Sequence, residues 1–185
     1  MMKDLSIDQL LSRCSANDQH AQLEVYRRYH LAMYHSALRI VQHAVDAEDV
    51  MQEGFLTAFE KLDQYKGENK FGGWLKQIVI RKALHLLEKR ERNKHYDLNE
   101  ALLSDPTENT EKSYDLQLLQ LHQALNQLKT RYRNVLILMY FEGYDYEEIS
   151  SILHLSYGNC RTLISRAKDQ LKQKLLSNEI PGKAI

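Results

Sequence analysis

The chain of 185 residues contains only two prolines and seven glycines. Residues that break helices or form tight turns are therefore scarce, whereas Leu, Gln, Glu, Lys and Ala are abundant. This composition favours helices, and no sheet is expected. An apolar fraction of 43% is enough to form packed cores, which excludes a disordered chain. The sequence predicts an all-α protein.

Cysteine is almost absent as well. Cys14 and Cys160 stand far apart in unrelated contexts, which gives neither a CxxC metal site nor a plausible disulfide, so both are expected to be reduced thiols. The first fifteen residues lack the continuous apolar run of a signal peptide, and no stretch is long enough to span a bilayer. We therefore expect no membrane insertion and a cytoplasmic location.

Arrangements that carry enzyme chemistry are missing too. The eight histidines are scattered, and there is no HExxH motif, no carboxylate paired with histidine on one helix face and no glycine-rich phosphate loop. No nucleophile lies in a motif with a general base. The sequence thus predicts no catalytic residues, no metal site and no cofactor.

Charge is present in blocks of alternating sign, although the formal net charge is zero. Residues 46–60 hold five acidic side chains and no basic one, and residues 61–94 hold ten basic against four acidic. Residues 97–115 hold six acidic side chains and one lysine, and residues 157–174 hold five basic and one acidic. Two basic blocks separated by an acidic connector keep nucleic acid open as a partner, despite the zero sum.

The stretch 97–113 is acidic, contains one of the two prolines and lacks sustained periodicity, which is typical of a linker. We therefore predict two small helical domains, residues 1–95 and 114–178, joined by a flexible linker at 96–113. Apolar periodicity predicts helices in the first domain at about 6–15, 21–41, 47–62 and, after the Gly72-Gly73 pair, 74–92. Two apolar stripes should pack together there: Leu23, Tyr26, Tyr29, Leu31, Met33, Tyr34, Leu38 and Val41 in one helix, and Phe55, Leu56, Phe59 and Leu62 in the next.

The segment 144–174 has the pattern of a helix-turn-helix. Asp145 is a predicted N-cap and Glu148, three residues later, completes a capping box for a helix that buries Ile149, Ile152 and Leu153. His154 is expected to turn the chain, because histidine is one of the few non-glycine residues enriched at positive φ, and Leu155 is expected to fill the core of the turn. Ser156 should then cap the second helix.

On this second helix an apolar stripe is expected to face the core, formed by Cys160, Leu163, Ile164, Ala167 and Leu171. The opposite face is left to side chains that suit DNA, namely Asn159, Arg161, Thr162, Ser165, Arg166 and Lys168. Arginine pairs with guanine edges and asparagine with adenine, mostly from the first half of a recognition helix. The alternative is an amphipathic hairpin whose basic face is merely solvated.

Several blocks, in this order, resemble bacterial sigma factors of the extracytoplasmic-function (ECF) group, which keep only the family's second and fourth conserved regions. Region two resembles LEVYRRYHLAMYHSALRI (23–40), DAEDVMQEGFLTAFEKLDQY (46–65) and FGGWLKQIVIRKALHLLEKR (71–90). Region four resembles LKTRYRNVLILMYFEGYDYEEISSILHLS (128–156) and the helix that follows it. The resemblance covers most of the chain and implies a transcription initiation factor with a region-two helical bundle and a region-four helix-turn-helix.

The resemblance also implies partners and site residues. Core RNA polymerase would be bound, through the clamp helices of its largest subunit, by Asp49, Gln52 and Glu53 on an uncompensated acidic face. Promoter DNA would be bound at a duplex minus-thirty-five-like element by the recognition helix. The minus-ten-like element would be opened and held by a loop and a basic helix that carry Tyr65, Lys66, Asn69, Lys70, Lys76, Gln77, Arg81, Lys82 and His85. Many relatives are held inactive by an anti-sigma factor, so such a partner is expected here.

Tyr65, Phe71 and Trp74 are candidate surfaces for stacking of bases, although a tryptophan at the start of an apolar stripe is more often a core residue. Two departures from the family pattern stand out. Arg81 and His85 replace an Asn and Asp pair, and Leu163 replaces a basic residue of the recognition helix. The base preference of relatives is therefore not transferred. The alternative function is a stand-alone helix-turn-helix regulator that binds a symmetric operator as a dimer without polymerase.

Overall fold

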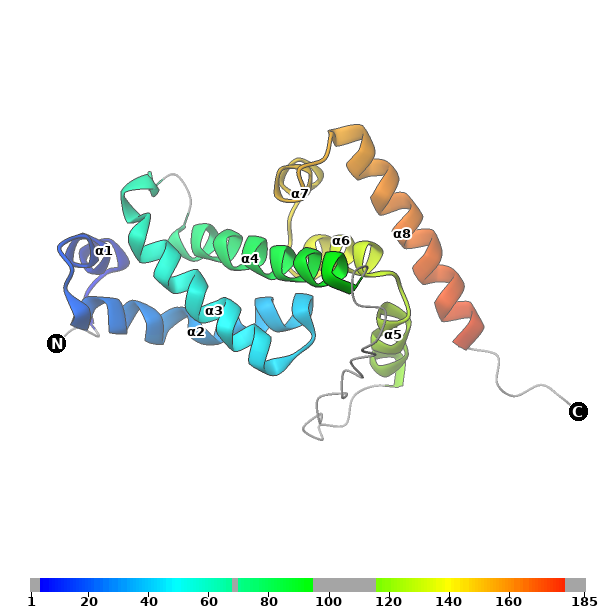
Figure 1. Ribbon diagram of the computed structural model, residues 1–185, viewed down its shortest axis with the longest axis horizontal. Coiled ribbons are helices and arrows are strands. Elements are labelled where there is room, and N and C mark those ends of the chain that lie inside the picture. Colours follow the sequence, from blue (N-terminus) through cyan, green and yellow to red (C-terminus); the bar gives the residue numbers. More distant parts are fainter. Residues whose placement is uncertain (1–3, 68–69, 95–115, 179–185) are drawn as a thin grey trace, which may run out of the picture. The chain divides into compact units, whose positions relative to one another are not determined.

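The computed structural model describes residues 4–67, 70–94 and 116–178, and the chain divides into two compact units, residues 1–107 and 108–185 (Figure 1). The described residues form eight α-helices, the short 3-10 helix Leu62–Gln64 and no strand. The predicted all-α class is confirmed. The division between the units falls within the predicted linker at 96–113, whose residues lie outside those described, so its exact bounds stay a prediction.

The first unit consists of α1 (Ile7–Ser15), α2 (Gln19–Val41), α3 (Ala44–Glu60), the 3-10 helix η2 (Leu62–Gln64) and α4 (Phe71–Lys94). Helices α2, α3 and α4 pack against one another, and α1 packs on α2 and touches η2. The core between them is apolar, and its fully buried side chains include Leu10, Val25, Ile40, Leu75, Val79 and Ile80. Where α3 crosses α4, a Cβ on Gly54 would lie 2.6 Å from Cγ2 of Val79. Glycine therefore permits the close approach of these two helices.

Side-chain caps set where α2 and α3 begin. The carboxylate of Asp18 accepts hydrogen bonds from the backbone N–H groups of His20 and Ala21, at 2.9 and 3.3 Å, so α2 starts two residues before the predicted Ala21. Nδ1 of His43 accepts from the N–H of Asp46 at 3.4 Å, so α3 starts three residues before the predicted start. Capping explains both differences, because apolar periodicity does not register the polar first turn of a helix.

Helix α4 begins at Phe71, so the Gly72-Gly73 pair lies inside its first turn, and the predicted start at Trp74 is wrong. Phe71 is only 2% exposed and packs edge-on against the ring of Tyr29, with centroids 5.5 Å apart. A Cβ on Gly72 would lie 2.9 Å from Cε1 of the same ring. The buried phenylalanine anchors the helix start, and the adjacent glycine leaves space for the tyrosine.

Three leucines of the predicted apolar stripes are exposed instead. Leu23 and Leu31 of α2 are 46% and 62% exposed, and Leu56 of α3 is 63% exposed. Their neighbours Val25, Met33 and Phe55 are buried and supply the packing. The predicted stripes were too wide, because the mixed residues of these long helices are compatible with more than one choice of buried face.

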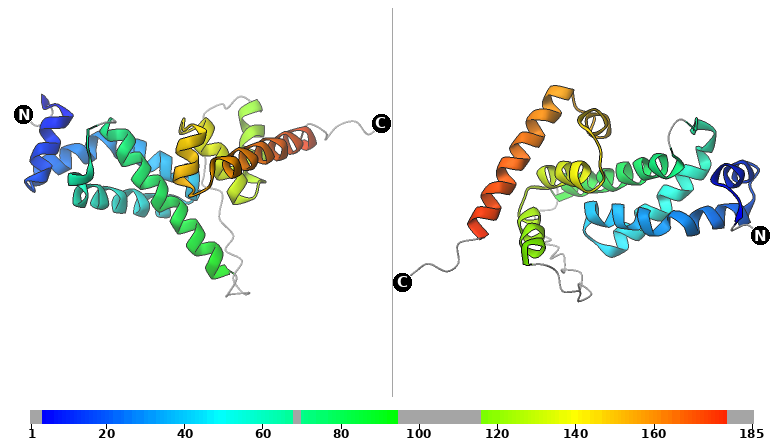
Figure 2. Two further views of the ribbon diagram at one scale, coloured as in Figure 1. Left: turned by 90° about the horizontal axis from the view of Figure 1, so that it is seen from above. Right: turned by 180° about the vertical axis from the view of Figure 1, so that it is seen from behind.

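The second unit consists of α5 (Leu116–Asn126), α6 (Thr130–Tyr140), α7 (Tyr146–Ile152) and α8 (Tyr157–Asn178). Helix α8 packs against the other three, and α6 also packs on α7. The short α7 leads into the long α8, and Figure 2 shows this arrangement in two further views. The core is formed by Ala124, Val135, Leu136, Leu138, Ile149, Cys160, Ile164 and Ala167. Across both units, none of the described helices has the length and apolarity needed to cross a membrane.

Candidate nucleic-acid and protein-binding surfaces

The turn between α7 and α8 is held by local polar contacts. The carboxylate of Asp145 accepts from the N–H of Glu148 at 2.8 Å, and the Glu148 carboxylate accepts from the N–H of Asp145 at 2.9 Å. His154 adopts φ 52°, and Oγ of Ser156 accepts from the N–H of Asn159 at 3.3 Å. The predicted capping box, histidine turn and serine cap are all confirmed. Leu153 and Leu155 are half-buried, so the core of the turn is formed chiefly by Ile149 and Ile152.

Helix α8 separates an apolar and a polar face as predicted. Cys160, Leu163, Ile164 and Ala167 are buried, and Leu171 is half-buried. Burial also raises the pKa of the Cys160 thiol. The opposite face is exposed and carries Asn159, Arg161, Thr162, Ser165 and Arg166. The Thr162 hydroxyl donates to the carbonyl oxygen of Gly158 at 3.0 Å, so its oxygen still has room to accept a hydrogen bond.

Lys168 differs from the other predicted DNA-binding residues of α8. It is half-buried, and its Nζ lies 5.5 Å from the centre of the Tyr140 ring at the end of α6. A hydrogen bond to Tyr140 is the main cause that raises the pKa of Lys168. The ammonium is thus charged and held between α8 and α6, whereas Arg161 and Arg166 extend from the surface.

The predicted minus-ten residues lie on α4 and on the segment before it. Arg81 and His85 are exposed, Lys76, Gln77 and Lys82 are half-buried, and Lys66 and Lys70 are exposed before the helix. Asn69 lies outside the described residues. Nζ of Lys82 lies 3.5 Å from Oε2 of Glu53 on α3, which partly neutralises one of the cations.

An aromatic cluster joins this segment to the helix. The Tyr65 ring lies 5.6 Å from Phe71 and 5.5 Å from Trp74, measured between centroids. Phe71 is buried and is therefore a core residue rather than a stacking surface. Tyr65 and Trp74 are half-buried, so each keeps part of its ring accessible. Burial also raises the pKa of the neighbouring Tyr29.

The predicted polymerase-binding residues Asp49, Gln52 and Glu53 are all exposed on α3. The expectation of an uncompensated acidic block is nevertheless wrong at two positions. Asp46 is only 8% exposed and pairs through both carboxylate oxygens with the Arg90 guanidinium of α4, with Nη2 at 2.7 Å from Oδ1. Glu53 pairs with Lys82. The partners are distant in sequence, so counting charges along one helix could not reveal these pairs.

Leu56 was missed as a surface residue. It follows Gln52 by one helical turn and is 63% exposed, so α3 presents an apolar side chain beside Asp49 and Gln52. The leucine adds apolar area to this otherwise polar part of the α3 surface. Its position four residues after Gln52 was the available signal.

Among residues 4–67, 70–94 and 116–178, no three His, Cys, Asp or Glu side chains gather in a group that could hold a metal ion.

Both units resemble conserved regions of a known protein family. The family description "Sigma-70 region 2" matches residues 25–93, and "Sigma-70, region 4" matches residues 118–171. The chain belongs to the sigma-70 family. The two matches include α3, almost all of α4 and the first two thirds of α8.

Full-length relatives agree with this assignment. The sigma factor is 29% identical over 178 residues to the RNA polymerase sigma-H factor of Pseudomonas aeruginosa, covering 90% of this chain and 92% of that one. It is 24% identical over 183 residues to the ECF RNA polymerase sigma factor SigW of Bacillus subtilis, covering 93% and 98%. The chain is therefore an ECF-type sigma factor, which binds core RNA polymerase and directs it to promoters. The alternative of a stand-alone dimeric regulator does not fit a chain matched along nearly its whole length by sigma factors.

Solved structures share the fold. The sigma factor RpoE of Bartonella quintana, in complex with the anti-sigma factor NepR, has a TM-score of 0.66 at 22% identity, covering 86% of this chain and 97% of that one.

Proposed function

We propose that the sigma factor divides promoter recognition between its two units. The exposed face of α8 binds the duplex minus-thirty-five-like element, α4 and the segment before it hold the opened minus-ten-like element, and α3 docks on the clamp helices of the polymerase. The observation that carries this proposal is the exposure of Arg161 and Arg166 on a helix whose start is fixed by the Ser156 cap. RNA synthesis itself belongs to the polymerase, and the protein acts in the cytoplasm.

For the duplex element, Asn159, Arg161 and Arg166 supply the side chains that distinguish bases in the major groove. They lie in the first half of α8, the half that enters the groove in helix-turn-helix proteins. Thr162 and Ser165 are exposed between them and suit contacts with bases or phosphates. Lys168 lies further along, with its charge directed toward Tyr140.

For the opened element, single strands need a cationic track and aromatic rings on which bases can stack. Lys66, Lys70 and Arg81 are exposed and provide the charge, together with the half-buried Lys76 and Lys82 of α4. His85 is exposed on the same helix and offers hydrogen bonds. The accessible parts of Tyr65 and Trp74 provide the rings. Asn69 and Gln77 complete the predicted set.

For the polymerase, Asp49, Gln52 and Leu56 form one exposed stripe of α3, and Glu53 lies beside it. Acidic side chains favour encounter with a basic surface, and the leucine supplies apolar area on docking. Because the structure of a relative holds an anti-sigma factor, we also propose that such a partner covers part of these surfaces when this protein is idle.

The free protein is expected to bind promoter DNA poorly, because the net charge of the chain is zero. Bound to the polymerase, the two units engage the same promoter, and the second contact becomes intramolecular. Two modest contacts then produce avidity. Run-off transcription by core polymerase on genomic fragments should show new specific starts only when this protein is added. The absence of both new starts and comigration with core would contradict the proposal.

The docking stripe has a sharper test in the double variant Asp49→Asn with Gln52→Ala. Both side chains are exposed, so the fold should persist, and Glu53 is left in place because it pairs with Lys82. We expect affinity for core polymerase, measured by comigration, to fall by about tenfold or more. Asp8→Asn, which removes one exposed acid of α1, is the matched control and should leave affinity unchanged. If the double variant and the control bound core polymerase with equal affinity, the polymerase would dock on a surface other than this stripe of α3.

A further inference from the structure

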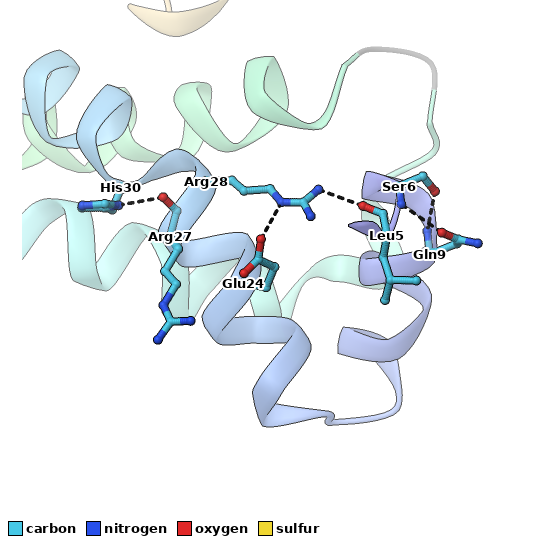
Figure 3. A network of polar contacts seen from close by, with 7 residues as sticks. All are labelled: Leu5, Ser6, Gln9, Glu24, Arg27, Arg28 and His30. Carbon is cyan, nitrogen blue, oxygen red and sulfur yellow. Dashed lines mark hydrogen bonds and ion pairs between the residues drawn. The ribbon is translucent and has the colours of Figure 1, made fainter. Parts of the chain in front are cut away.

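Helix α1 is tied to α2 by one arginine (Figure 3). Nη1 of Arg28 donates to the carbonyl oxygen of Leu5 at 2.9 Å, and Nε donates to the Glu24 carboxylate, also at 2.9 Å. Leu5 directly precedes Ser6, whose side chain forms a capping box with Gln9 at the start of α1. The guanidinium therefore holds the backbone one residue before the N-cap of α1.

Burial makes this contact more than a surface pair. Glu24 is only 6% exposed, so its carboxylate depends on Arg28 for a charged partner. Leu10, Leu11 and Cys14 of α1 are buried, and α1 packs on α2. Both α1 and Glu24 precede residue 25, where the match to region two begins.

Helix α1 also touches η2, the 3-10 turn at the end of α3 (Figure 1). At η2, the N–H of Gln64 donates to the carbonyl oxygen of Lys61 at 2.9 Å, and the N–H of Tyr65 donates to the carbonyl oxygen of Leu62 at 3.2 Å. Short 3-10 turns have poor hydrogen-bond geometry and depend on packing from outside. Tyr65 and Lys66, two of the residues proposed to hold the opened strand, follow η2 directly.

We propose that α1 is a strut for the segment that holds the opened promoter strand, and that Arg28 is the positioning residue that fixes this strut. The inference rests on the function proposed for Tyr65 and Lys66. It assigns no DNA contact to Arg28 itself. The anchor at Leu5 fixes α1, α1 supports η2, and η2 sets where Tyr65 leaves the bundle.

Arg28→Lys separates the anchor from the general stability of the unit. A lysine keeps the positive charge for Glu24, but its single ammonium lacks the planar fork that reaches the carboxylate and the Leu5 carbonyl together. Arg27→Lys is the matched control, because Arg27 is the exposed neighbour whose side chain points away from the network in Figure 3. The nearby His30 bonds within α2, with Nδ1 at 3.1 Å from the Arg27 carbonyl oxygen, and does not take part in the anchor.

Two measurements on the full chain test the proposal. Hydrogen exchange at the Gln64 and Tyr65 amides should be about five- to tenfold faster in Arg28→Lys than in Arg27→Lys, the scale of one lost hydrogen bond. Promoter opening by the saturated holoenzyme, followed by the permanganate reactivity of unpaired thymines, should slow by about threefold or more. Affinity for core polymerase should stay unchanged.

The possible results separate the two claims. Unchanged exchange at Gln64 and Tyr65 would overturn the strut. Faster exchange with unchanged opening would overturn its role in promoter opening and leave the proposed function intact. If the wild-type holoenzyme itself opened no promoter, the proposed function would fail, and the role of α1 with it.

Discussion

The two units use their basic residues differently. In the first unit, Lys82 and Arg90 of α4 pair with Glu53 and Asp46 of α3. In the second unit, Arg161 and Arg166 of α8 are exposed and pair with no carboxylate among the described residues. The number of basic residues at 61–94 therefore exceeds the number of unpaired positive charges that α4 can offer to DNA. The block on α8 is smaller, but Arg161 and Arg166 are free of such pairs within the described part of the chain.

The difference follows from how each proposed DNA-binding helix is built. Helix α4 is part of a tightly packed bundle and must also hold α3, so some of its cations are used within the fold. Helix α8 is positioned by the Ser156 cap and its apolar underside, which leaves the part of its polar face around Arg161 and Arg166 unoccupied. Packing and proposed DNA binding share residues in the first unit and are largely separated in the second, where Lys168 contacts Tyr140.

The largest effect that tests this contrast is expected from Gly54→Leu. A Cβ at Gly54 would already lie 2.6 Å from Val79, which is completely buried, so a leucine must push α3 away from α4. Overpacking of this kind should destabilise the first unit by about 3 kcal/mol. Scanning calorimetry should show a lower transition for this unit and an unchanged one for the second. Gly73→Leu is the control, because a Cβ there meets nothing within 4 Å. Equal losses in both variants would refute tight packing at Gly54.

A slightly smaller effect on the free energy of unfolding is expected at alkaline pH. It comes from the one buried thiol that each unit contains. Burial, with a smaller contribution from Asp18, raises the pKa of Cys14 from 9.0 to about 11. The unfolded thiol ionises near pH 9 and the folded one does not, so the contribution of Cys14 to the free energy of unfolding is constant below pH 9 and falls between pH 9 and 11. The loss for the first unit should approach about 2 to 3 kcal/mol.

Cys14→Ala should flatten this pH dependence in the first unit alone, measured as the difference in unfolding free energy between variant and wild type across pH 8 to 11. Burial also raises the pKa of Cys160, so Cys160→Ala should act in the same sense on the second unit only. A change in both units from either single variant would show that they do not unfold separately.

Much of the second unit could be predicted from its sequence because its determinants are local. Asp145 and Glu148 lie three residues apart, as do Ser156 and Asn159, and each pair forms the predicted cap. His154 adopts the positive φ that its residue type permits. A helix-turn-helix is read from short-range signals, so its boundaries and its exposed face followed from the pattern.

The first unit was harder to predict because its determinants are distant in sequence. Asp46 and Arg90 are 44 residues apart, and Glu53 and Lys82 are 29 apart, so no local pattern indicates that they pair. Leu31 and Leu56 have the residue type of a core and are exposed. Helix α4 starts at Phe71 because that ring packs against Tyr29 of α2, a contact that overrides the two glycines after it.

The smallest expected effect concerns the salt dependence of promoter binding, which measures how many cations contact phosphate. Each side chain that contacts a phosphate of duplex DNA contributes about 0.9 to the steepness of log affinity against log salt, and each contact with a single strand contributes about 0.7. Removing such a side chain makes the dependence shallower by that amount. Arg166→Gln should show nearly the full change if its guanidinium also contacts the backbone. Lys82→Gln should show less than 0.7, about half, because Glu53 already partly neutralises this lysine. Glu53→Gln should then restore the full contribution of Lys82, and steepen the slope, provided that core affinity is held saturating. Equal slopes for the Lys82 and Arg166 variants would mean that the ion pair opens when DNA binds, and the contrast between the two units would then hold only for the free protein.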